Sequence, residues 1–357
     1  MRKVLIDLRM VRGRMHGIAR YALELARRLP VLAPDLRFVG LTGPSGLPLG
    51  LGPLRPVLPL ERCPAEFLSP LEQPALAFAL ARSGADLFHA TSFSLPGLWP
   101  GRLVATLHDA NHLALRDNYG PGRVAYYRLV VGPRARTARA LITLTEFSRD
   151  ELARHLGLNP YRLQVIAQGV GEGFARVSES AVADFNRRRG LPQRYLAAVG
   201  TEKAHKNLAV LAKVSGSLPA PIALLAGPGA VRRLGFSPET VDLGELPEEE
   251  LACFYSGATA LLLPSRYEGF GLPALEAMAC GCPVVAAQAG ALPEVVREAG
   301  LLVPPDDAEG WRDAALRLLR DEALRRTLAE RGLTRASLYT WDDTARRTLA
   351  VYRRALG

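Results

Sequence analysis

Two glutamates with seven residues between them, Glu268 and Glu276, are the clearest candidates for chemistry in this sequence. Residues 265–272 read as a loop with two glycines, and Pro273 suits the first turn of a helix, where its missing N–H costs nothing. Such a helix start offers unpaired amides and a positive dipole end to an anion. Glu276, one turn into the helix, would accept hydrogen bonds from sugar hydroxyls, while Glu268 would face the part of the ligand beyond its phosphates.

The sequence on both sides of the loop predicts the elements that must hold these glutamates. An apolar run at 259–263 predicts a buried strand before it, and the apolar run at 284–287 predicts another after the helix. Gly281 is the residue type that ends a helix. In an open α/β sheet, a loop between a strand's carboxyl end and a helix is where ligands bind.

One lysine could neutralise a phosphate beside these carboxylates. The chain has 41 arginines and only four lysines, so a lysine at a strand-to-helix loop suggests that a compact ammonium group is needed there. Lys206 occupies such a loop, after an apolar run at 195–199.

The first half of the chain adds two further candidates. Gly17 precedes an amphipathic helix and would let the backbone approach a ligand closely. The loop before this helix is expected to be strongly cationic through Arg9, Arg12, Arg14, His16 and Arg20. His108 follows the apolar run at 103–107 and therefore falls at the ligand-binding edge of a sheet.

The string PSRYEGFGLPALEAMACGCPVVA resembles the signature of the retaining nucleotide-sugar glycosyltransferases of family 4, which have the GT-B fold. The resemblance implies an α/β protein of two Rossmann-like domains whose parallel sheets face an interdomain cleft. It implies catalytic roles for Glu268, His108 and Lys206. It also implies that the donor is bound by Gly17, Lys206, Arg266, Glu268, Phe270, Gly271, Leu272 and Glu276.

This chain departs from the family pattern at two positions. Ala19 stands where a second glycine is usual, and His205 stands where some members carry a phosphate-binding arginine. The second cation therefore stays open between Arg266 and Lys203.

Alternating apolar strand-like runs and helical patterns predict parallel sheets with helical crossovers, and 357 residues exceed the usual size of one core. We expect an acceptor-side domain at 1–175 and a nucleotide-sugar-binding domain at 181–340. By the resemblance, a last helix at 341–357 packs back on the first domain. Residues 43–59 are too rich in proline and glycine for regular structure. Ser148 is expected to cap a helix, with Glu151 completing a capping box.

Charge is distributed unevenly along the chain. Residues 1–180 hold 23 Lys and Arg against 14 Asp and Glu, whereas residues 181–357 hold 22 against 21. This predicts an anionic partner for the first half, such as a membrane surface or lipid-linked phosphate, although an arginine-rich composition alone explains it equally well. No apolar run is long enough to span a membrane, and the N-terminus does not resemble a signal peptide. We expect a cytoplasmic protein, with peripheral contact at the inner face of the membrane left open, and no nucleic-acid partner.

No Asp-x-Asp pair follows a strand, so a metal-independent reaction without a cofactor is expected, with an NDP-sugar as donor substrate. The resemblance favours mannose over glucose, and GDP-mannose over a UDP-sugar. It leaves a glycan, a lipid-linked molecule or a small molecule as acceptor. A nucleotide-sugar epimerase or phosphorylase of the same architecture is the alternative enzyme, and a non-catalytic anion-binding protein is the third possibility.

Overall fold

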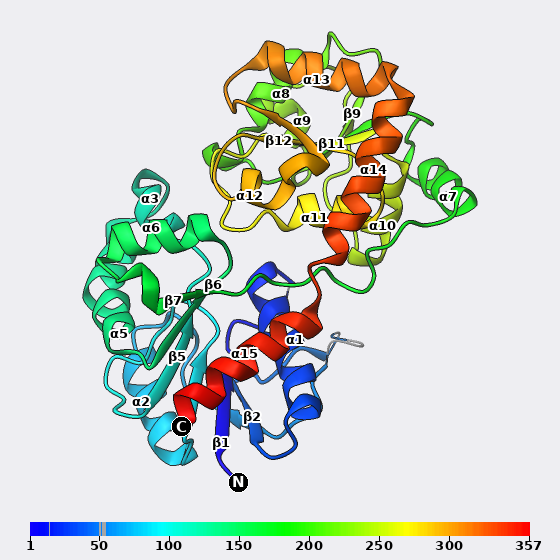
Figure 1. Cartoon of the computed structure of the whole chain (residues 1–357). Coiled ribbons are helices and arrows are strands. Elements are labelled where there is room, and N and C mark those ends of the chain that lie inside the picture. Colours follow the sequence, from blue (N-terminus) through cyan, green and yellow to red (C-terminus); the bar gives the residue numbers. More distant parts are fainter. Residues whose placement is uncertain (14, 50, 52–54) are drawn as a thin grey trace. The chain divides into compact units, whose positions relative to one another are not determined.

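A computed structural model of the chain describes residues 1–13, 15–49, 51 and 55–357 (Figure 1). Arg14 and part of the loop expected at 43–59 lie outside the described residues. The described chain divides into two compact units, Met1–Gly169 with Thr340–Gly357 (unit 1) and Val170–Tyr339 (unit 2).

Unit 1 is built on a parallel sheet, which has seven strands in the described part of the chain, in the order β3-β2-β1-β4-β5-β6-β7. These strands are β1 (Lys3–Asp7), β2 (Arg37–Thr42), β3 (Leu60–Arg62), β4 (Leu87–Ala90), β5 (Arg102–Thr106), β6 (Ala140–Thr143) and β7 (Leu163–Val165). The order reverses direction between β1 and β4, which places the expected ligand edge of unit 1 at the carboxyl ends of these two strands.

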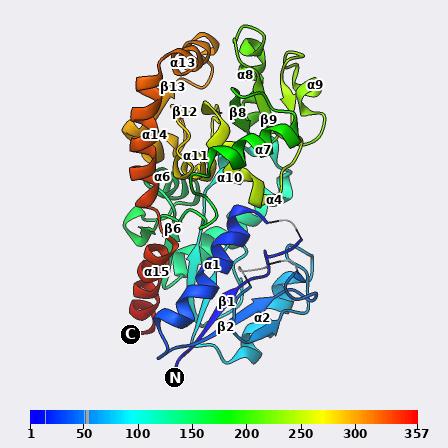
Figure 2. The same ribbon diagram turned by 90° about the vertical axis from the view of Figure 1, so that its right-hand side faces the viewer.

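Helices cover both faces of the unit 1 sheet. The longer ones are α1 (Gly17–Leu32), α2 (Glu72–Ser83), α6 (Glu146–Leu156) and α15 (Trp341–Leu356). The shorter ones are α3 (Asn111–Ala114), η2 (Arg116–Asn118), α4 (Pro121–Tyr126), the π-helix η3 (Tyr127–Val131), α5 (Gly132–Thr137) and η4 (Pro160–Arg162). Helix α15 packs along α1 and contacts β4 and β5 (Figures 1 and 2). The other face packs on α2, α5 and α6, whose apolar side chains share one buried cluster with the strands.

Unit 2 has a second parallel sheet, with six strands among the described residues, in the order β10-β9-β8-β11-β12-β13. They are β8 (Leu196–Val199), β9 (Ile222–Leu225), β10 (Val241–Asp242), β11 (Ala260–Leu263), β12 (Val284–Ala287) and β13 (Gly300–Val303). Here the order reverses between β8 and β11. All four residues of β11 are buried, as expected of a strand covered on both faces.

The unit 2 sheet is covered by helices of varied length. They are α7 (Glu179–Arg189), η5 (Ala204–Lys206), α8 (Leu208–Ser215), α9 (Ala230–Leu234), α10 (Glu248–Gly257), α11 (Leu272–Ala279), α12 (Leu292–Val296), η6 (Arg297–Ala299), α13 (Ala308–Arg320) and α14 (Glu322–Ser337). Helix α14 follows α13 and packs against α11 (Figure 2). The sequence had given no expectation for α14.

The helix caps confirm one expectation and correct another. Gly281 follows α11 with φ 73°, and the chain turns there as its amide donates to the Met278 carbonyl at 3.0 Å. Ser148, in contrast, is not a cap. Helix α6 begins at Glu146, two residues earlier, and its N-cap is Thr145, whose hydroxyl accepts a hydrogen bond from the Ser148 amide at 3.1 Å.

Candidate active site

The unit 2 candidates gather where the strand order reverses. Strands β8 and β11 are neighbours, and each runs directly into one of the loops singled out in the sequence. The loop after β8 carries Lys206, and the loop after β11 carries Arg266 and Glu268. Because parallel strands end at the same edge of a sheet, the two loops meet above that edge.

Lys206 and Glu268 are in direct contact. The Lys206 Nζ donates to the Glu268 Oε1 at 2.7 Å, and the side chains are 22% and 12% exposed. The group expected to bind phosphate is thus neutralised by the group expected to orient the sugar. A diphosphate that approached Lys206 would have to compete with this carboxylate.

Arg266 is held from two sides but stays accessible. Its Nε donates to Asp306 Oδ1 at 3.1 Å, its Nη1 donates to the Ala204 carbonyl at 3.3 Å, and the side chain is exposed. The Arg266 amide donates to the His205 carbonyl at 2.8 Å, which joins the two loops through their backbones.

His205 does not replace the phosphate-binding arginine of related sequences as an exposed cation. Its side chain is buried, and its Nδ1 has no hydrogen-bond partner among the described residues. Burial, and then the charge of Lys206, lower the pKa of His205, so the ring is disfavoured as a cation.

Asn207 fixes the carboxyl-end loops of three strands. It adopts a left-handed conformation with φ 53°, which asparagine tolerates better than most residues. Its side-chain amide donates to the carbonyls of Pro264 and Pro305, at 3.2 and 2.6 Å. One buried side chain therefore sets the spacing of the loops after β8, β11 and β13.

Gly290 supports the backbone of Glu268. Its φ of 60° lies in the left-handed region, and a Cβ placed there would come within 2.8 Å of the Glu268 amide nitrogen. Next to it, the Ala291 amide donates to the Glu268 carbonyl at 3.0 Å. Only glycine allows this approach without displacing the backbone that carries the carboxylate.

The start of α11 presents the predicted donor-binding backbone. Gly271 precedes the helix with φ 90°, and Leu272 is its first residue. The amides of Phe270, Gly271 and Leu272 donate to no acceptor in the part of the chain that the structure describes. The Phe270 ring is buried and lies edge-on to Tyr339 at 5.9 Å, so its backbone is the part that can serve a ligand.

Glu276 lies one turn into α11, and its carboxylate is almost buried. Its Oε2 accepts a hydrogen bond of 3.4 Å from the Tyr255 hydroxyl of α10. The Tyr255 pKa is raised well above its usual value, first by burial and then by the charge of Glu276, so the phenol remains a donor.

The remaining two candidates, His108 and Gly17, belong to unit 1. The His108 Nε2–H donates to the Thr91 carbonyl at 2.9 Å, and its ring lies edge-on to Tyr21 at 5.0 Å. Burial and, to a smaller extent, the neighbouring His16 together lower the pKa of His108 to about 4. His108 is therefore neutral at physiological pH, with its proton on Nε2 and its lone pair on Nδ1.

Gly17 begins α1 immediately after its N-cap. The His16 Nδ1 accepts from the Ala19 amide at 3.3 Å, and its Nε2–H donates to the Met10 carbonyl at 3.2 Å. A Cβ at Gly17 would meet nothing within 4 Å, so the space in front of this helix start is open.

The expected cationic loop before α1 is partly wrong. The Arg9 side chain is fully buried, and it donates to Asp7 at 2.8 Å and to Glu72 at 2.8 Å. Arg20 is also buried, and burial lowers the pKa of His16. Of the described members, Arg12 keeps an exposed side chain, and it pairs with Glu66 at 3.0 Å.

Two family models match the chain in succession. The one described as Glycosyltransferase Family 4 matches residues 15–172, and the one described as Glycosyl transferases group 1 matches residues 193–321. The D-inositol 3-phosphate glycosyltransferase of Frankia alni is 30% identical over 401 residues, which cover 96% of each chain. The chain belongs to glycosyltransferase family 4. The expected class of enzyme, a hexosyltransferase, is confirmed.

Other relatives of this family 4 glycosyltransferase include the O-antigen chain mannosyltransferase B of Escherichia coli. It is 28% identical over 379 residues, covering 98% of this chain and 99% of the relative. Among solved structures, HepE of Anabaena in complex with UDP-glucose has a TM-score of 0.79 at 18% identity, covering 98% of this chain and 99% of that one. Sucrose-phosphate synthase of Thermosynechococcus elongatus has a TM-score of 0.78 at 22% identity, covering 99% of both. The expected GT-B fold is confirmed.

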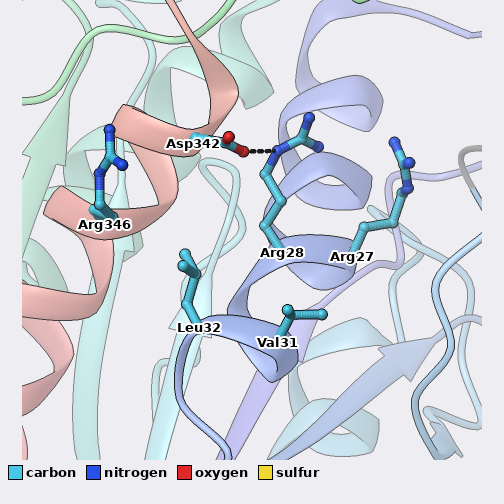
Figure 3. A pocket seen from close by; sticks show the side chains of 6 residues that line it. All are labelled: Arg27, Arg28, Val31, Leu32, Asp342 and Arg346. Carbon is cyan, nitrogen blue, oxygen red and sulfur yellow. Dashed lines mark hydrogen bonds and ion pairs between the residues drawn. The ribbon is translucent and has the colours of Figure 1, made fainter.

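A pocket of about 350 Å³ lies elsewhere on unit 1 of this glycosyltransferase, between α1 and α15 (Figure 3). Its lining consists of Arg27, Arg28, Val31, Leu32, Asp342 and Arg346. The Arg28 Nε donates to Asp342 Oδ1 at 2.8 Å, and both Arg27 and Arg28 pair with Glu24. These acids offset the arginines, and the Arg28–Asp342 pair joins α1 to α15 beside the pocket.

Sequence reasoning missed the residues that hold the family 4 site in place. Asn207 follows Lys206 directly, and an asparagine before a helix signals a cap or a left-handed turn. Gly290 lies in the GALPE run after β12, where a glycine at a strand end also signals a special backbone position. The partners of both residues are far away in the sequence, so their roles could not be derived from local patterns.

Proposed function

We propose that this enzyme transfers a hexose, with mannose favoured, from a nucleoside-diphosphate sugar to an acceptor, without a metal ion and with retention of configuration. The acceptor class is a glycan, a lipid-linked molecule or a small molecule. The observation that carries the proposal is the contact of Lys206 with Glu268 where β8 and β11 end, beside the open amides at the start of α11.

The cations and amides fit the charge of a departing diphosphate. Negative charge builds up on the leaving phosphate as the glycosidic bond breaks, and preorganised donors aimed at it lower the barrier. Lys206 supplies an ammonium group, the amides of Gly271 and Leu272 supply neutral donors, and Arg266 supplies an exposed guanidinium. Among these residues, Lys206 is the one whose present partner would have to be displaced.

The acidic and imidazole side chains fit contacts with hydroxyl groups. Glu268 would orient hydroxyls of the donor sugar once a phosphate occupies Lys206. Glu276, held by the Tyr255 hydroxyl, would accept hydrogen bonds from the ribose. His108, whose Nε2–H is bound to Thr91, would offer Nδ1 to a hydroxyl of the sugar.

Retention requires that the acceptor and the leaving phosphate lie on the same face of the sugar. The leaving phosphate can then accept the acceptor's proton, so the bond to the acceptor oxygen forms as the bond to phosphate breaks. No separate base is needed in such a step. His108 is neutral in this scheme and does not act as an acid.

The names of two related proteins bear on the sugar and on the nucleotide of the donor. The Escherichia coli relative is named a mannosyltransferase, which favours mannose. The Anabaena structure contains UDP-glucose, which keeps a UDP-sugar as the alternative to GDP-mannose.

The test combines binding and turnover. Thermal-shift measurements against UDP, GDP, ADP and their sugar conjugates identify the donor, and the anomeric proton coupling of the product reports its configuration. Lys206→Ala and Glu268→Ala are each expected to abolish transfer and to leave thermal unfolding nearly unchanged. Full turnover in either variant removes that residue from the mechanism, and an inverted product rejects the retaining step.

A further inference from the structure

One layer of unit 1 combines arginines with an absence of acidic residues. The segments 73–85, 87–108 and 118–145, which are separated by Asp86 and by residues 109–117, contain no aspartate or glutamate, and the Glu72 side chain at the start of α2 is buried. They contain seven arginines, which are Arg82, Arg102, Arg123, Arg128, Arg134, Arg136 and Arg139. Among the side chains that the structure describes, none of the seven has a carboxylate within 4.0 Å.

Hydrogen bonds join these segments into one layer. The Gln73 side chain of α2 donates to the Leu95 carbonyl at 3.2 Å and to the Tyr126 hydroxyl at 3.1 Å, and it accepts from the Gly97 amide at 2.8 Å. The Arg134 Nη2 of α5 donates to the Trp99 carbonyl at 3.0 Å. Helix α2, the loop after β4 and the α4–η3–α5 run therefore form a continuous surface, which we call the acid-free face.

Large apolar side chains project from this face. Leu98 in the loop is 87% exposed, and Leu129 in η3 is 76% exposed. They come from adjoining parts of the layer, because a Cβ on Gly97 would lie 4.0 Å from Val130 Cγ1. Leu71, the N-cap of α2, and Phe78, in the helix, are also exposed, and the Arg82 guanidinium lies 5.4 Å from the Phe78 ring centre.

The next helix of the same layer shows that arginine content alone does not produce such a surface. Helix α6 also carries arginines, but Arg149 pairs with Glu146, and Arg154 pairs with Glu151. Its charges are compensated within the helix, whereas those of the acid-free face are not.

We propose that the acid-free face binds the surface of an anionic lipid bilayer, with Leu98 and Leu129 inserted among the acyl chains and the arginines on lipid phosphates. Exposed leucines beside arginines without a carboxylate partner match the two components of interfacial binding, which are apolar insertion and attraction to anionic headgroups. A nucleic acid would use the arginines but would leave the leucines in water. The surface is independent of hexose transfer, so either proposal can fail alone.

Sedimentation of the full chain with vesicles of phosphatidylcholine, with and without phosphatidylglycerol, tests this surface. We expect binding that requires phosphatidylglycerol and weakens as salt is added. The double variant Leu98→Ser, Leu129→Ser should bind the anionic vesicles at least about tenfold more weakly, because two exposed leucines no longer insert. Arg82→Gln with Arg128→Gln should weaken binding by a similar factor.

Matched controls lie on the opposite face of unit 1. Val31, on α1, is 81% exposed, and Arg346 lies on α15. Val31→Ser and Arg346→Gln should bind anionic vesicles as the unchanged protein does. All variants alter exposed side chains, and their thermal unfolding should remain the same.

Three results overturn the proposal. The first is equal binding to vesicles with and without phosphatidylglycerol, and the second is unchanged vesicle binding by the leucine variant. The third is binding to duplex DNA with the same affinity as to anionic vesicles, unaffected by the leucine substitutions. Transfer to a water-soluble acceptor should be unaffected in the leucine variant, which separates this test from that of the proposed function.

Discussion

Replacing Glu268 with glutamine should strengthen the binding of a nucleoside diphosphate while slowing the transfer of its sugar. In the unliganded protein Lys206 is bound to Glu268 at 2.7 Å, so a diphosphate must take the ammonium group from the carboxylate. Glutamine keeps the size of the side chain and an oxygen that can accept from Lys206, but it removes the charge. The variant therefore lowers the cost of ligand binding without opening a cavity.

The geometry sets the size of this effect. At 2.7 Å, two unit charges attract by about 6 kcal/mol at an effective dielectric constant of about 20, which is an upper bound. Both side chains keep contact with solvent, and pairs of this kind contribute about 1 kcal/mol net. We therefore expect nucleoside diphosphates to bind about fivefold more tightly. Turnover should fall about a hundredfold, because the sugar is no longer oriented.

Isothermal titration with GDP and UDP measures the first effect, and steady-state transfer measures the second. Glu202 is the matched control, because it lies on the loop that carries Lys206 and its carboxylate is paired with the exposed Arg233 instead of Lys206. Glu202→Gln should leave both the nucleotide affinity and the turnover unchanged.

The reasoning is refuted if Glu268→Gln binds nucleoside diphosphates no more tightly than the unchanged enzyme. That result would mean that the ion pair does not compete with the ligand. Unchanged turnover would instead remove Glu268 from the orientation of the sugar.

Three further predictions concern the parts that hold the fold and the site. Gly290→Ala should reduce turnover, because the new Cβ displaces the Glu268 backbone. Gly227 also has a positive φ, but a Cβ there would meet nothing within 4 Å, so Gly227→Ala should lower stability alone. Transfer assays and thermal melts distinguish the two effects. Asn207→Asp should lower the free energy of unfolding by about 2 kcal/mol, because both donated hydrogen bonds are lost. Urea denaturation measures this change, and an unchanged midpoint of the transition would contradict the prediction. Burial lowers the pKa of His89 to about 3, so the unfolded state takes up a proton at this side chain first. Acidification from about pH 7.5 to about pH 5 should therefore remove about 2 kcal/mol of stability through His89 alone. His89→Gln should reduce the pH dependence by that amount in urea melts at several pH values, and an equal slope would refute the prediction.

The central strand-loop-helix-strand unit could be predicted because its signals are local. Each element begins or ends at a residue whose effect reaches only a few positions. These residues are Pro264 after β11, Pro273 in the first turn of α11 and Gly281 after the helix. The apolar runs are continuous because both faces of a parallel sheet are covered. The resemblance to family 4 rests on the same residues.

The errors arise where a partner is distant or a pattern occurs twice. Arg9 looked like a free cation, but its partner Glu72 is 63 residues away and reaches it only through the fold. The capping pattern was ambiguous because two hydroxyl residues, Thr145 and Ser148, stand three positions apart. Both are buried; Thr145 is the N-cap and Ser148 lies inside the helix.

The Lys206–Glu268 contact could not be derived from the sequence either. Both residues were singled out for separate roles, and 62 residues separate them. Their contact follows from β8 and β11 being neighbours in the sheet, although they are not consecutive strands. This strand order is a property of the whole unit 2 fold.

The central claim is that Lys206 and the start of α11 bind the diphosphate of the donor. The most direct test is the affinity ratio between a nucleoside diphosphate and the matching monophosphate, measured by titration in the unchanged enzyme and in Lys206→Ala. A charge-assisted contact to the second phosphate predicts a ratio of at least about tenfold in the unchanged enzyme, which should fall close to one in the variant. An equal ratio in both proteins would contradict the account.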